Sequence, residues 1–251
     1  MADVFVLGHR GMLGQTVARY LAEQGYDIVT SDRRYTGMPD DPLIEELRSS
    51  SARVIVNCIG VLGPDPMLMA VDALLPWEVA GLGRLVIHPS TDCVFRGDRG
   101  WYSVEDPPDA IATGGRGFYG LAKRMGEVHA SNVVILRASI MAPSGGTLGW
   151  FLSQSGPIDG WTDHRWNGTT TLAWARLAAD AIEGRIGPGL HQPTTTETIT
   201  KYDLLRLFGR VFDHPIEVRP VSTEPCDRSL EPTIVMPPIR DQLVALREWM
   251  A

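Results

Sequence analysis

Apolar runs and amphipathic stretches alternate through the first half of the chain. Five short apolar runs are typical of buried β-strands, at residues 3–7, 27–30, 53–57, 85–88 and 133–136. Between them, apolar residues recur at helical spacing in a stretch that ends at Gly25 and in residues 40–51, 66–82 and 118–130. Because the strands alternate with helices and are apolar throughout, we predict an α/β fold with a parallel sheet covered on both faces.

The pattern changes after Arg137. Pro, Gly, Ser and Thr become frequent, and helices are expected at residues 172–183, 201–212 and 239–250, with loops between them. We therefore predict a first domain over residues 1–138 and a smaller lobe over residues 139–251, with segments near residues 165–192 returning to the first domain. Ligands bind at the carboxyl edge of open α/β sheets, so the smaller lobe is expected to cover that edge.

The composition narrows the class of protein. The 251 residues carry a net charge of −7, with 44% hydrophobic and 21% charged residues, which is typical of a soluble globular protein. The negative charge argues against nucleic-acid binding as the main function, and no apolar run approaches the ~18 residues that cross a membrane. The first residues lead into a strand without a basic segment, and the three Cys are scattered without metal-site spacing. We expect a cytoplasmic, reduced protein with no metal.

A glycine-rich turn follows the first predicted strand. Gly8, Gly11 and Gly14 recur at every third position between that strand and the first helix. Such glycines permit a tight turn and let the backbone approach a pyrophosphate, which the helix N-terminus then binds. An ordinary glycine-rich turn has the same spacing, but the position inside a β-α-β unit favours a dinucleotide cofactor. The residues expected to bind it here are Gly8, His9, Arg10, Gly11, Met12 and Leu13.

The residues after the second strand bear on which cofactor binds. Asp32 lies at the end of that strand, where an acid can bind the adenosine ribose hydroxyls and favour NAD(H). Arg33 follows directly and Arg10 lies in the glycine turn, where both would converge on a 2′-phosphate and favour NADP(H). Solvated loop charge is the alternative for the arginines. We favour NADP(H), with NAD(H) as the alternative.

Two further strands end in small or polar residues. After the third strand come Cys58, Ile59 and Gly60. These residues would let the adenosine of a cofactor pass along the sheet edge, and an ordinary strand-to-loop transition is the alternative. After the fourth strand, Ser90 is expected near the nicotinamide. Thr91 is placed to hydrogen-bond a substrate carbonyl or a tyrosine oxygen. A turn-forming polar cluster is the alternative interpretation of this segment.

Tyr119 and Lys123 are the most informative pair in the chain. The sequence uses 21 Arg but only two Lys, so a lysine four residues after a tyrosine is notable. On a helix this spacing places both side chains on one face. A nearby ammonium favours the phenolate and lowers a tyrosine pKa that is ordinarily near ~10, which would give a proton donor for use near neutral pH. An exposed helical pair is the alternative.

Together these residues resemble the extended short-chain dehydrogenase/reductase superfamily, and within it the dTDP-4-dehydrorhamnose reductase type. The stretches that carry the resemblance occur in the family's order and cover nearly the whole chain: residues 8–14, 90–95, 119–123, 166–171 and 199–205. The glycine turn also resembles that of GDP-fucose synthase, an NADP enzyme. The resemblance implies a Rossmann-type doubly wound parallel sheet with a smaller C-terminal substrate-binding lobe.

The resemblance also implies an activity and a set of site residues. The activity would be NADPH-dependent reduction of a 4-keto group on a nucleotide-linked 6-deoxysugar, with Thr91, Tyr119 and Lys123 as catalytic residues. Tyr119 and Lys123 would also contact the cofactor. The residues expected at the substrate are Thr91, Asp92, Cys93, Val94, Arg137 and Trp166. Arg137 would meet the diphosphate or be structural, and Trp166 would stack on the substrate or cover the core between lobes. A homodimer is the candidate assembly.

Some positions depart from the family pattern and keep other functions open. Cys93 stands where rhamnose reductases usually have Tyr, Gly117 and Phe118 precede Tyr119 unusually, and the chain is short for the family. The alternatives are a nucleotide-sugar epimerase of the same superfamily and a non-catalytic NADP-binding regulatory subunit. Dehydratases usually carry a Glu after the Asp that follows the catalytic Thr, and Cys93 occupies that place, which disfavours dehydration.

Overall fold

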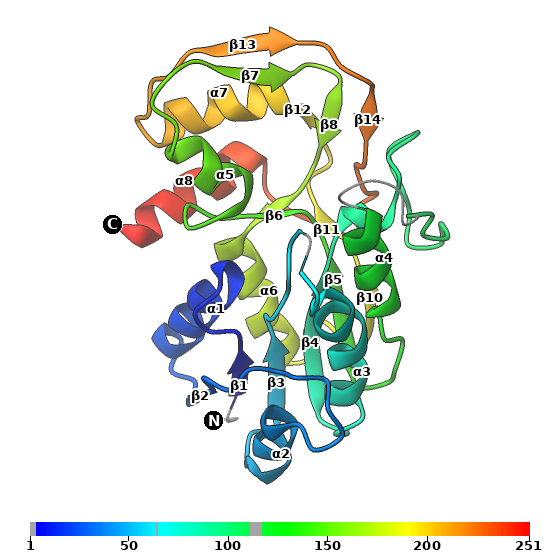
Figure 1. Ribbon diagram of the computed structural model, residues 1–251. Coiled ribbons are helices and arrows are strands. Elements are labelled where there is room, and N and C mark those ends of the chain that lie inside the picture. The colour runs from blue at the N-terminus through cyan, green and yellow to red at the C-terminus, as the bar shows by residue number, and fades with distance from the viewer. Residues whose placement is uncertain (1–3, 64, 111–116) are drawn as a thin grey trace.

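The centre of the molecule is a six-stranded sheet in which every neighbouring pair of strands is parallel (Figure 1). The computed structural model describes residues 4–63, 65–110 and 117–251. The strand order is β10-β5-β4-β3-β1-β2. The strands are β1 (Val4–Leu7), β2 (Ile28–Thr30), β3 (Val54–Asn57), β4 (Leu85–Ser90), β5 (Val133–Arg137) and β10 (Gly189–His191). The chain runs outward from β1 to β2 and then returns to β3 on the other side, so the order reverses between β1 and β3.

Helices cover both faces of this sheet. One face is packed by α1 (Met12–Glu23) and α6 (Thr171–Ile182), and the other by α2 (Pro42–Ser49) and α3 (Leu75–Ala80). Successive strand residues point to opposite faces, so Val4 and Val6 join the core under α1 while Phe5 and Leu7 join the core under α2. This double burial explains why the strands read as continuous apolar runs.

Local signals fix where the helices begin. The Asp41 carboxylate accepts the backbone N–H groups of Leu43 and Ile44, and Pro42 occupies the first helical position of α2. The hydroxyl of Thr170 caps α6, and that of Thr200 caps α7 (Lys201–Val211). Each cap supplies an acceptor to N–H groups that have no partner within their own helix.

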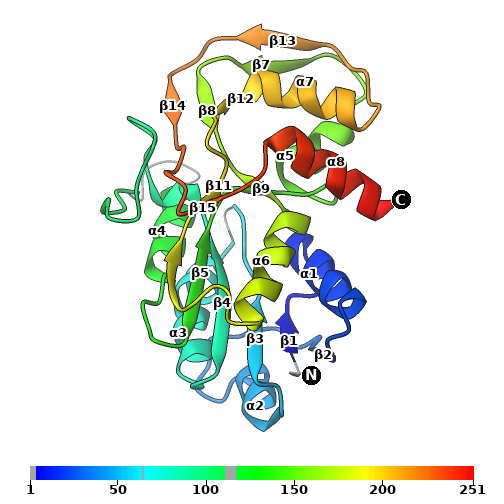
Figure 2. The ribbon, with the colours of Figure 1, turned by 180° about the vertical axis from the view of Figure 1, so that it is seen from behind.

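A second lobe lies beyond one end of the sheet (Figures 1 and 2). Its helices α5 (Gly146–Leu152), α7 and α8 (Ile239–Met250) surround a core that includes Phe151, Phe208 and Leu243. Its larger strand groups are β7 (Ile158–Trp161) with β13 (Val218–Val221), and β8 (His164–Trp166) with β12 (Ile199–Thr200) and β14 (Cys226–Asp227). Two short pairs join the lobes, β6 (Ile140–Met141) with β9 (Thr169–Thr170) and β11 (Pro193–Thr194) with β15 (Ile234–Val235).

The α/β fold and its parallel sheet confirm the prediction from the sequence, and the differences are local. The helix expected at residues 66–82 contains a π-helical turn, η1 (Ala70–Leu74), before α3. The helix expected at residues 118–130 is α4 (Gly117–Met125) and ends before Gly126. Part of the loop expected at residues 95–117 and the start of the first strand lie outside the described residues. The sixth strand, α5 and the short strands of the second lobe were not predicted.

The division at residue 138 stays a prediction. After that point the chain enters the second lobe and later returns to the sheet, where α6 packs on α1 and β10 pairs with β5. Among the helices that the structure describes, none combines the length and the apolar character needed to cross a membrane.

Candidate active site

The glycine turn between β1 and α1 leaves no room for larger residues. Gly8 has φ +71°, and its carbonyl accepts the N–H of Gly11 at 2.8 Å. A Cβ on Gly14 would lie 2.1 Å from the Gly8 oxygen, so this helix position requires glycine. The start of α1 has Gly11 as its cap and no capping hydrogen bond from that residue's side chain, and the first N–H groups of a helix have no partner within the helix itself. Such a turn fits the phosphates of a dinucleotide, as predicted.

The turn lies against the segment that follows β3. A Cβ on Gly8 would meet the backbone of Cys58 and Ile59 at 3.0 Å. The Cys58 thiol is half-buried, and burial raises its pKa while the charge of Lys123 lowers it. Gly60 borders the carboxylate of Asp72. The residues expected along the adenosine therefore lie between the glycine turn and the Tyr–Lys helix, at the point where the strand order reverses.

The charged residues expected to choose the cofactor have different partners. The Asp32 carboxylate pairs with Arg10 at 2.8 Å and lies 3.5 Å from the His9 imidazole. Arg33 pairs instead with Glu46 of α2 at 3.2 Å. Each guanidinium thus pairs with a separate carboxylate in this structure, and the convergence of Arg10 and Arg33 on a 2′-phosphate stays a prediction. Their contacts with a cofactor stay predictions.

Thr91 and Tyr119 come together beyond the end of β4. The Thr91 hydroxyl accepts the N–H of Cys93 at 3.2 Å and donates to Asp92 at 3.1 Å, which caps the short helix η2 (Asp92–Val94). The Thr91 side chain lies close enough to the Tyr119 phenol to lower the pKa of that phenol. The turn-forming interpretation of Thr91 is therefore confirmed by this cap, and its catalytic role stays a prediction.

The environment of Tyr119 favours the protonated phenol. Burial raises the pKa of Tyr119 well above its ordinary value, and the charges of Cys93, Asp72 and Asp92 raise it further. The Thr91 side chain acts in the opposite direction but is the smaller effect. The expectation that Lys123 holds this pKa down is wrong for this structure, because burial dominates. Tyr119 therefore keeps its proton across neutral pH.

Lys123 is buried rather than exposed beside Tyr119. Only 3% of the residue is exposed, and its ammonium lies 3.7 Å from a carboxylate oxygen of Asp72. Burial lowers the pKa of Lys123, while Asp72 and then Glu127 raise it. Sequence reasoning missed Asp72. The available signal was a single acid inside an otherwise apolar helical stretch, residues 67–77.

Arg137 belongs to the interior of the protein. It is 1% exposed and donates to both oxygens of Glu127, at 2.8 and 2.6 Å, and to Gln192 at 3.1 Å. The Ser90 hydroxyl donates to the same Glu127 at 2.5 Å. The assignment of Arg137 to the substrate is wrong, because every nitrogen of its guanidinium has a buried partner. The hydroxyl proton of Ser90 is likewise engaged inside the protein, and its contact with a cofactor stays a prediction.

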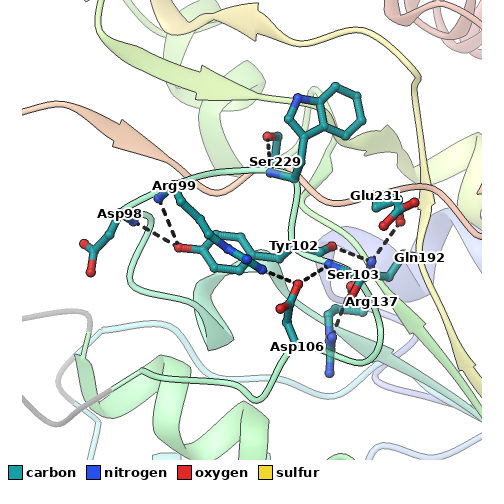
Figure 3. A network of polar contacts seen from close by, with 10 residues as sticks. Asp98, Arg99, Tyr102, Ser103, Asp106, Arg137, Gln192, Ser229 and Glu231 are labelled. Atoms are coloured by element: carbon teal, nitrogen blue, oxygen red, sulfur yellow. Dashed lines mark hydrogen bonds and ion pairs between the residues drawn. The ribbon is translucent and has the colours of Figure 1, made fainter.

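The Arg137 cluster continues into a network between the loop after β4 and the C-terminal part of the chain (Figure 3). Gln192 donates to the carbonyl oxygens of Tyr102 and Glu231, both at 2.8 Å. The Tyr102 ring stacks on Phe95 at 4.1 Å between ring centres, and its hydroxyl accepts the N–H of Asp98. These contacts hold residues 95–102 of the loop that begins at Thr91.

Two more residues expected at the substrate are buried in cores. Val94 is fully buried and packs with Phe95 and Leu230. Trp166 is 3% exposed in the core of the second lobe, with the Lys201 ammonium 5.3 Å from its ring centre. Both assignments to the substrate are wrong, because neither side chain reaches an accessible surface.

Asp92 and Cys93 are half-buried next to Tyr119, and their contact with substrate stays a prediction.

Arg228, which sequence reasoning missed, donates to the Phe95 carbonyl oxygen at 2.9 Å. Burial lowers the pKa of Arg228, but Cys93, Cys226 and Asp92 raise it to a net value above the ordinary one. No local spacing marks Arg228, because the chain brings it there from the second lobe. Within the described residues, no group of three or more His, Cys, Asp or Glu side chains is arranged to hold a metal ion.

A parallel doubly wound sheet, a glycine turn after β1 and a Thr–Tyr–Lys set beyond β4 define an extended short-chain dehydrogenase/reductase. The chain belongs to the NAD dependent epimerase/dehydratase family, whose model matches residues 4–134. This membership confirms the resemblance that the sequence motifs indicated.

Two relatives of known name share about 30% of their residues with this chain over the matched region. A probable low-salt glycan biosynthesis reductase, Agl14, from Haloferax volcanii is 31% identical over 163 residues, which cover 55% of this chain and 53% of that protein. This match therefore spans about half of each protein. A probable dTDP-4,6-dihydroxy-2-methyloxan-3-one 4-ketoreductase from Streptomyces antibioticus is 28% identical over 249 residues, which cover 86% of this chain and 80% of that protein.

Solved structures of similar fold include two dTDP-4-dehydrorhamnose reductases. The Bacillus anthracis protein, in complex with NADP, has a TM-score of 0.80 at 19% identity. The Clostridium acetobutylicum protein has a TM-score of 0.79 at 17% identity. Each match covers 99% of both chains, so the second lobe shares the fold as well as the sheet domain.

Proposed function

We propose that this chain reduces a 4-keto group on a nucleotide-linked 6-deoxysugar, with NADPH as the favoured electron donor and NADH as the alternative. The observation that carries the proposal is that Thr91 lies next to Tyr119, with Lys123 one helical turn further along α4. The names of the relatives support it, since one is called a reductase of glycan biosynthesis and another a 4-ketoreductase of a dTDP-linked compound.

The proton of the reaction comes from Tyr119. Its pKa is raised by burial, so the phenol holds the proton that the carbonyl oxygen needs as it becomes an alkoxide. The Thr91 hydroxyl orients the same oxygen and shares its developing charge. A bound nicotinamide would supply the hydride that the carbonyl carbon accepts. Together the hydride and the Tyr119 proton convert the ketone to an alcohol.

The cofactor would be held by the glycine turn and the Tyr–Lys helix. The N–H groups at the start of α1 would bind the pyrophosphate, with residues 8–13 around it. Lys123 would bond the nicotinamide ribose, as the resemblance implies. Arg10 is the residue that favours NADPH, because its exposed guanidinium lies at the end of β2 next to Asp32.

Turnover assays test this proposal. Oxidation of NADPH and of NADH is followed by absorbance with a panel of nucleotide-linked 4-keto-6-deoxysugars. Tyr119→Phe removes only the proton donor, so kcat should fall by about 10²- to 10⁴-fold while cofactor affinity stays near that of the wild type. Tyr26→Phe is the matched control, because its hydroxyl donates to Glu183 on the surface, away from the Tyr–Lys helix.

The possible results separate the alternatives. Interconversion of sugar epimers without net NADPH oxidation would indicate an epimerase. Cofactor binding without turnover on any sugar would indicate a non-catalytic regulatory subunit. A Tyr119→Phe variant with normal kcat would exclude the role given to Tyr119.

The proposal extends to assembly and location. We expect a homodimer, since α3 and α4 expose Trp77, Phe118 and Met125. The Trp77 indole N–H bonds the Met125 carbonyl oxygen, so the Trp77 side chain lies at the end of α4. Sedimentation velocity tests this expectation, and a monomer at micromolar concentration would exclude it. A cytoplasmic location is expected for an enzyme that uses a nucleotide-linked sugar and NADPH.

A further inference from the structure

A buried carboxylate faces the catalytic lysine. Asp72 is 0% exposed, lies in the π-helical turn η1, and has one oxygen 3.7 Å from the Lys123 ammonium. A buried charge is costly unless a partner of opposite sign compensates it. The two side chains come from segments about fifty positions apart, and each is the nearest opposite charge that the described structure gives to the other.

The backbone holds Asp72 in place from several sides. Its second carboxylate oxygen accepts the N–H of Val61 at 3.2 Å. A Cβ on Gly126 would lie 2.1 Å from the Asp72 carbonyl oxygen, so the end of α4 packs directly on the π-helical turn. A Cβ on Gly60 would approach the carboxylate at 3.4 Å. π-Helical turns are often found at functional sites, and here the turn directs an acid at the catalytic helix.

We propose that Asp72 is a positioning residue of this site, whose carboxylate fixes the Lys123 ammonium and keeps it protonated for its work with Tyr119 and the cofactor. This inference rests on the proposed function for its role in the reaction. Burial disfavours both charges, since it leaves the pKa of Asp72 raised and that of Lys123 lowered. The Val61 N–H opposes burial at Asp72, and the charges of Asp72 and Glu127 oppose it at Lys123.

Other titratable groups face the same two side chains. Besides Asp72, those near Lys123 are Glu127 after α4, Cys58 after β3 and His88 on β4. His88 is buried, which lowers its pKa well below the ordinary value and keeps it neutral, and Glu127 is bound to Arg137. Those near Tyr119 are Cys93 and Asp92, with Asp72 itself. Asp72 is the carboxylate common to both side chains.

Removal of the Asp72 charge should shift the pKa values of Lys123 and Tyr119 in the same direction. In Asp72→Asn, Lys123 loses the main charge that raises its pKa, and Tyr119 loses a like charge that raises its own. Both pKa values therefore fall. The alkaline limb of the reductive pH–rate profile should move to lower pH by about 1 to 3 units, the usual effect of one close charge.

The small number of lysines permits a test that needs no turnover. Lysine labelled with ¹³C at Cε gives two side-chain signals, and Lys201→Arg assigns them. The Lys123 signal should titrate about 1 to 3 pH units lower in Asp72→Asn than in the wild type, with Lys201 as the internal reference. Equal midpoints in the two proteins would overturn the inference.

Matched variants separate positioning from a structural role. Asp41→Asn removes another buried carboxylate, the cap of α2, and should leave both the Lys123 midpoint and the alkaline limb unchanged. Asp72→Glu should restore part of the shift. A loss of kcat at every pH with no movement of the limb would refute the positioning role.

Two results distinguish this inference from the proposed function. A shifted Lys123 midpoint in a protein that reduces no sugar would support the pair and refute the ketoreductase. If Asp72→Asn does not fold, Lys123→Met leaves Asp72 buried without its cation. Burial already raises the pKa of Asp72, and the loss of the Lys123 charge raises it further. Stability from such a group is lost as pH rises, so the melting temperature of Lys123→Met should approach that of the wild type on acidification. A difference in melting temperature between the two proteins that does not change with pH would contradict the Asp72–Lys123 pair.

Discussion

Replacement of Arg137 by Met should destabilise the protein strongly without a specific loss of substrate affinity. Arg137 is 1% exposed, and its ion pair with Glu127 has N–O distances of 2.8 and 2.6 Å. The variant leaves the Glu127 carboxylate buried without its cation and the Gln192 oxygen without its donor. Breaking a buried pair in this way costs about 3–5 kcal/mol, or roughly 6–20 °C in melting temperature for a chain of this size.

Urea denaturation and thermal melting measure this loss. Glu127→Gln combined with Arg137→Met removes both charges and should recover at least ~1 kcal/mol, because no charge remains buried. Arg185→Met is the surface control, since this exposed arginine pairs with Asp180 at 2.5 Å and the loss should stay below ~1 kcal/mol.

The kinetic readout distinguishes the two roles considered for Arg137. Below its melting temperature, the variant should retain a KM for the sugar within a few-fold of the wild type. A raised KM together with unchanged stability would refute the structural role and return Arg137 to the substrate site.

Two further predictions concern the cofactor turn and the start of α2. Gly14→Ala places a Cβ 2.1 Å from the Gly8 oxygen, so the turn must open. We expect a loss of about 1–3 kcal/mol in stability and at least ~10-fold in NADPH affinity by fluorescence titration. Gly156→Ala, whose Cβ meets nothing within 4 Å, should change neither, and unchanged affinity in Gly14→Ala would exclude this turn from the cofactor site. Asp41→Asn weakens the cap of α2 and should cost about 1 kcal/mol at neutral pH. Burial raises the pKa of Asp41, but hydrogen bonds from Thr36 and the start of α2 lower it to a net value below the ordinary one, so its stabilising effect is present above the unfolded pKa and lost as pH falls. Acid melts of the wild type and the variant should therefore converge, and parallel curves would contradict this assignment.

The sequence predicted those parts of the fold that depend on local pattern. The apolar strands, the glycine turn and the Tyr–Lys spacing each lie within a few consecutive residues, and the structure places all of them as expected. The π-helical turn was not predictable in the same way. It amounts to one residue inserted into an α-helix, and the hydrophobic spacing of such a segment is nearly the same as that of a regular α-helix. The strands of two to four residues in the second lobe have no alternation long enough to detect.

The site was harder to predict wherever a side chain's role depends on distant partners. Arg137 follows an apolar strand at the sheet edge, which suits both a substrate contact and an internal ion pair. Only the arrival of Glu127 and Gln192 around it decides between them. Tyr119 is the converse case, since its partner Lys123 was visible in the sequence, whereas Asp72 and the burial that dominates its pKa were not.

The return of the chain to the sheet has a consequence for synthesis on the ribosome. The helix α1 is covered by α6, with Thr16 donating to Thr171 at 3.2 Å, and the sheet gains its edge strand β10 only at residues 189–191. A nascent chain that has emerged only as far as β5 would expose Val17, Leu21 and Leu136 to water. The nucleotide-binding half therefore cannot mature as an early, autonomous unit, and its folding must wait until about three quarters of the polypeptide has left the exit tunnel.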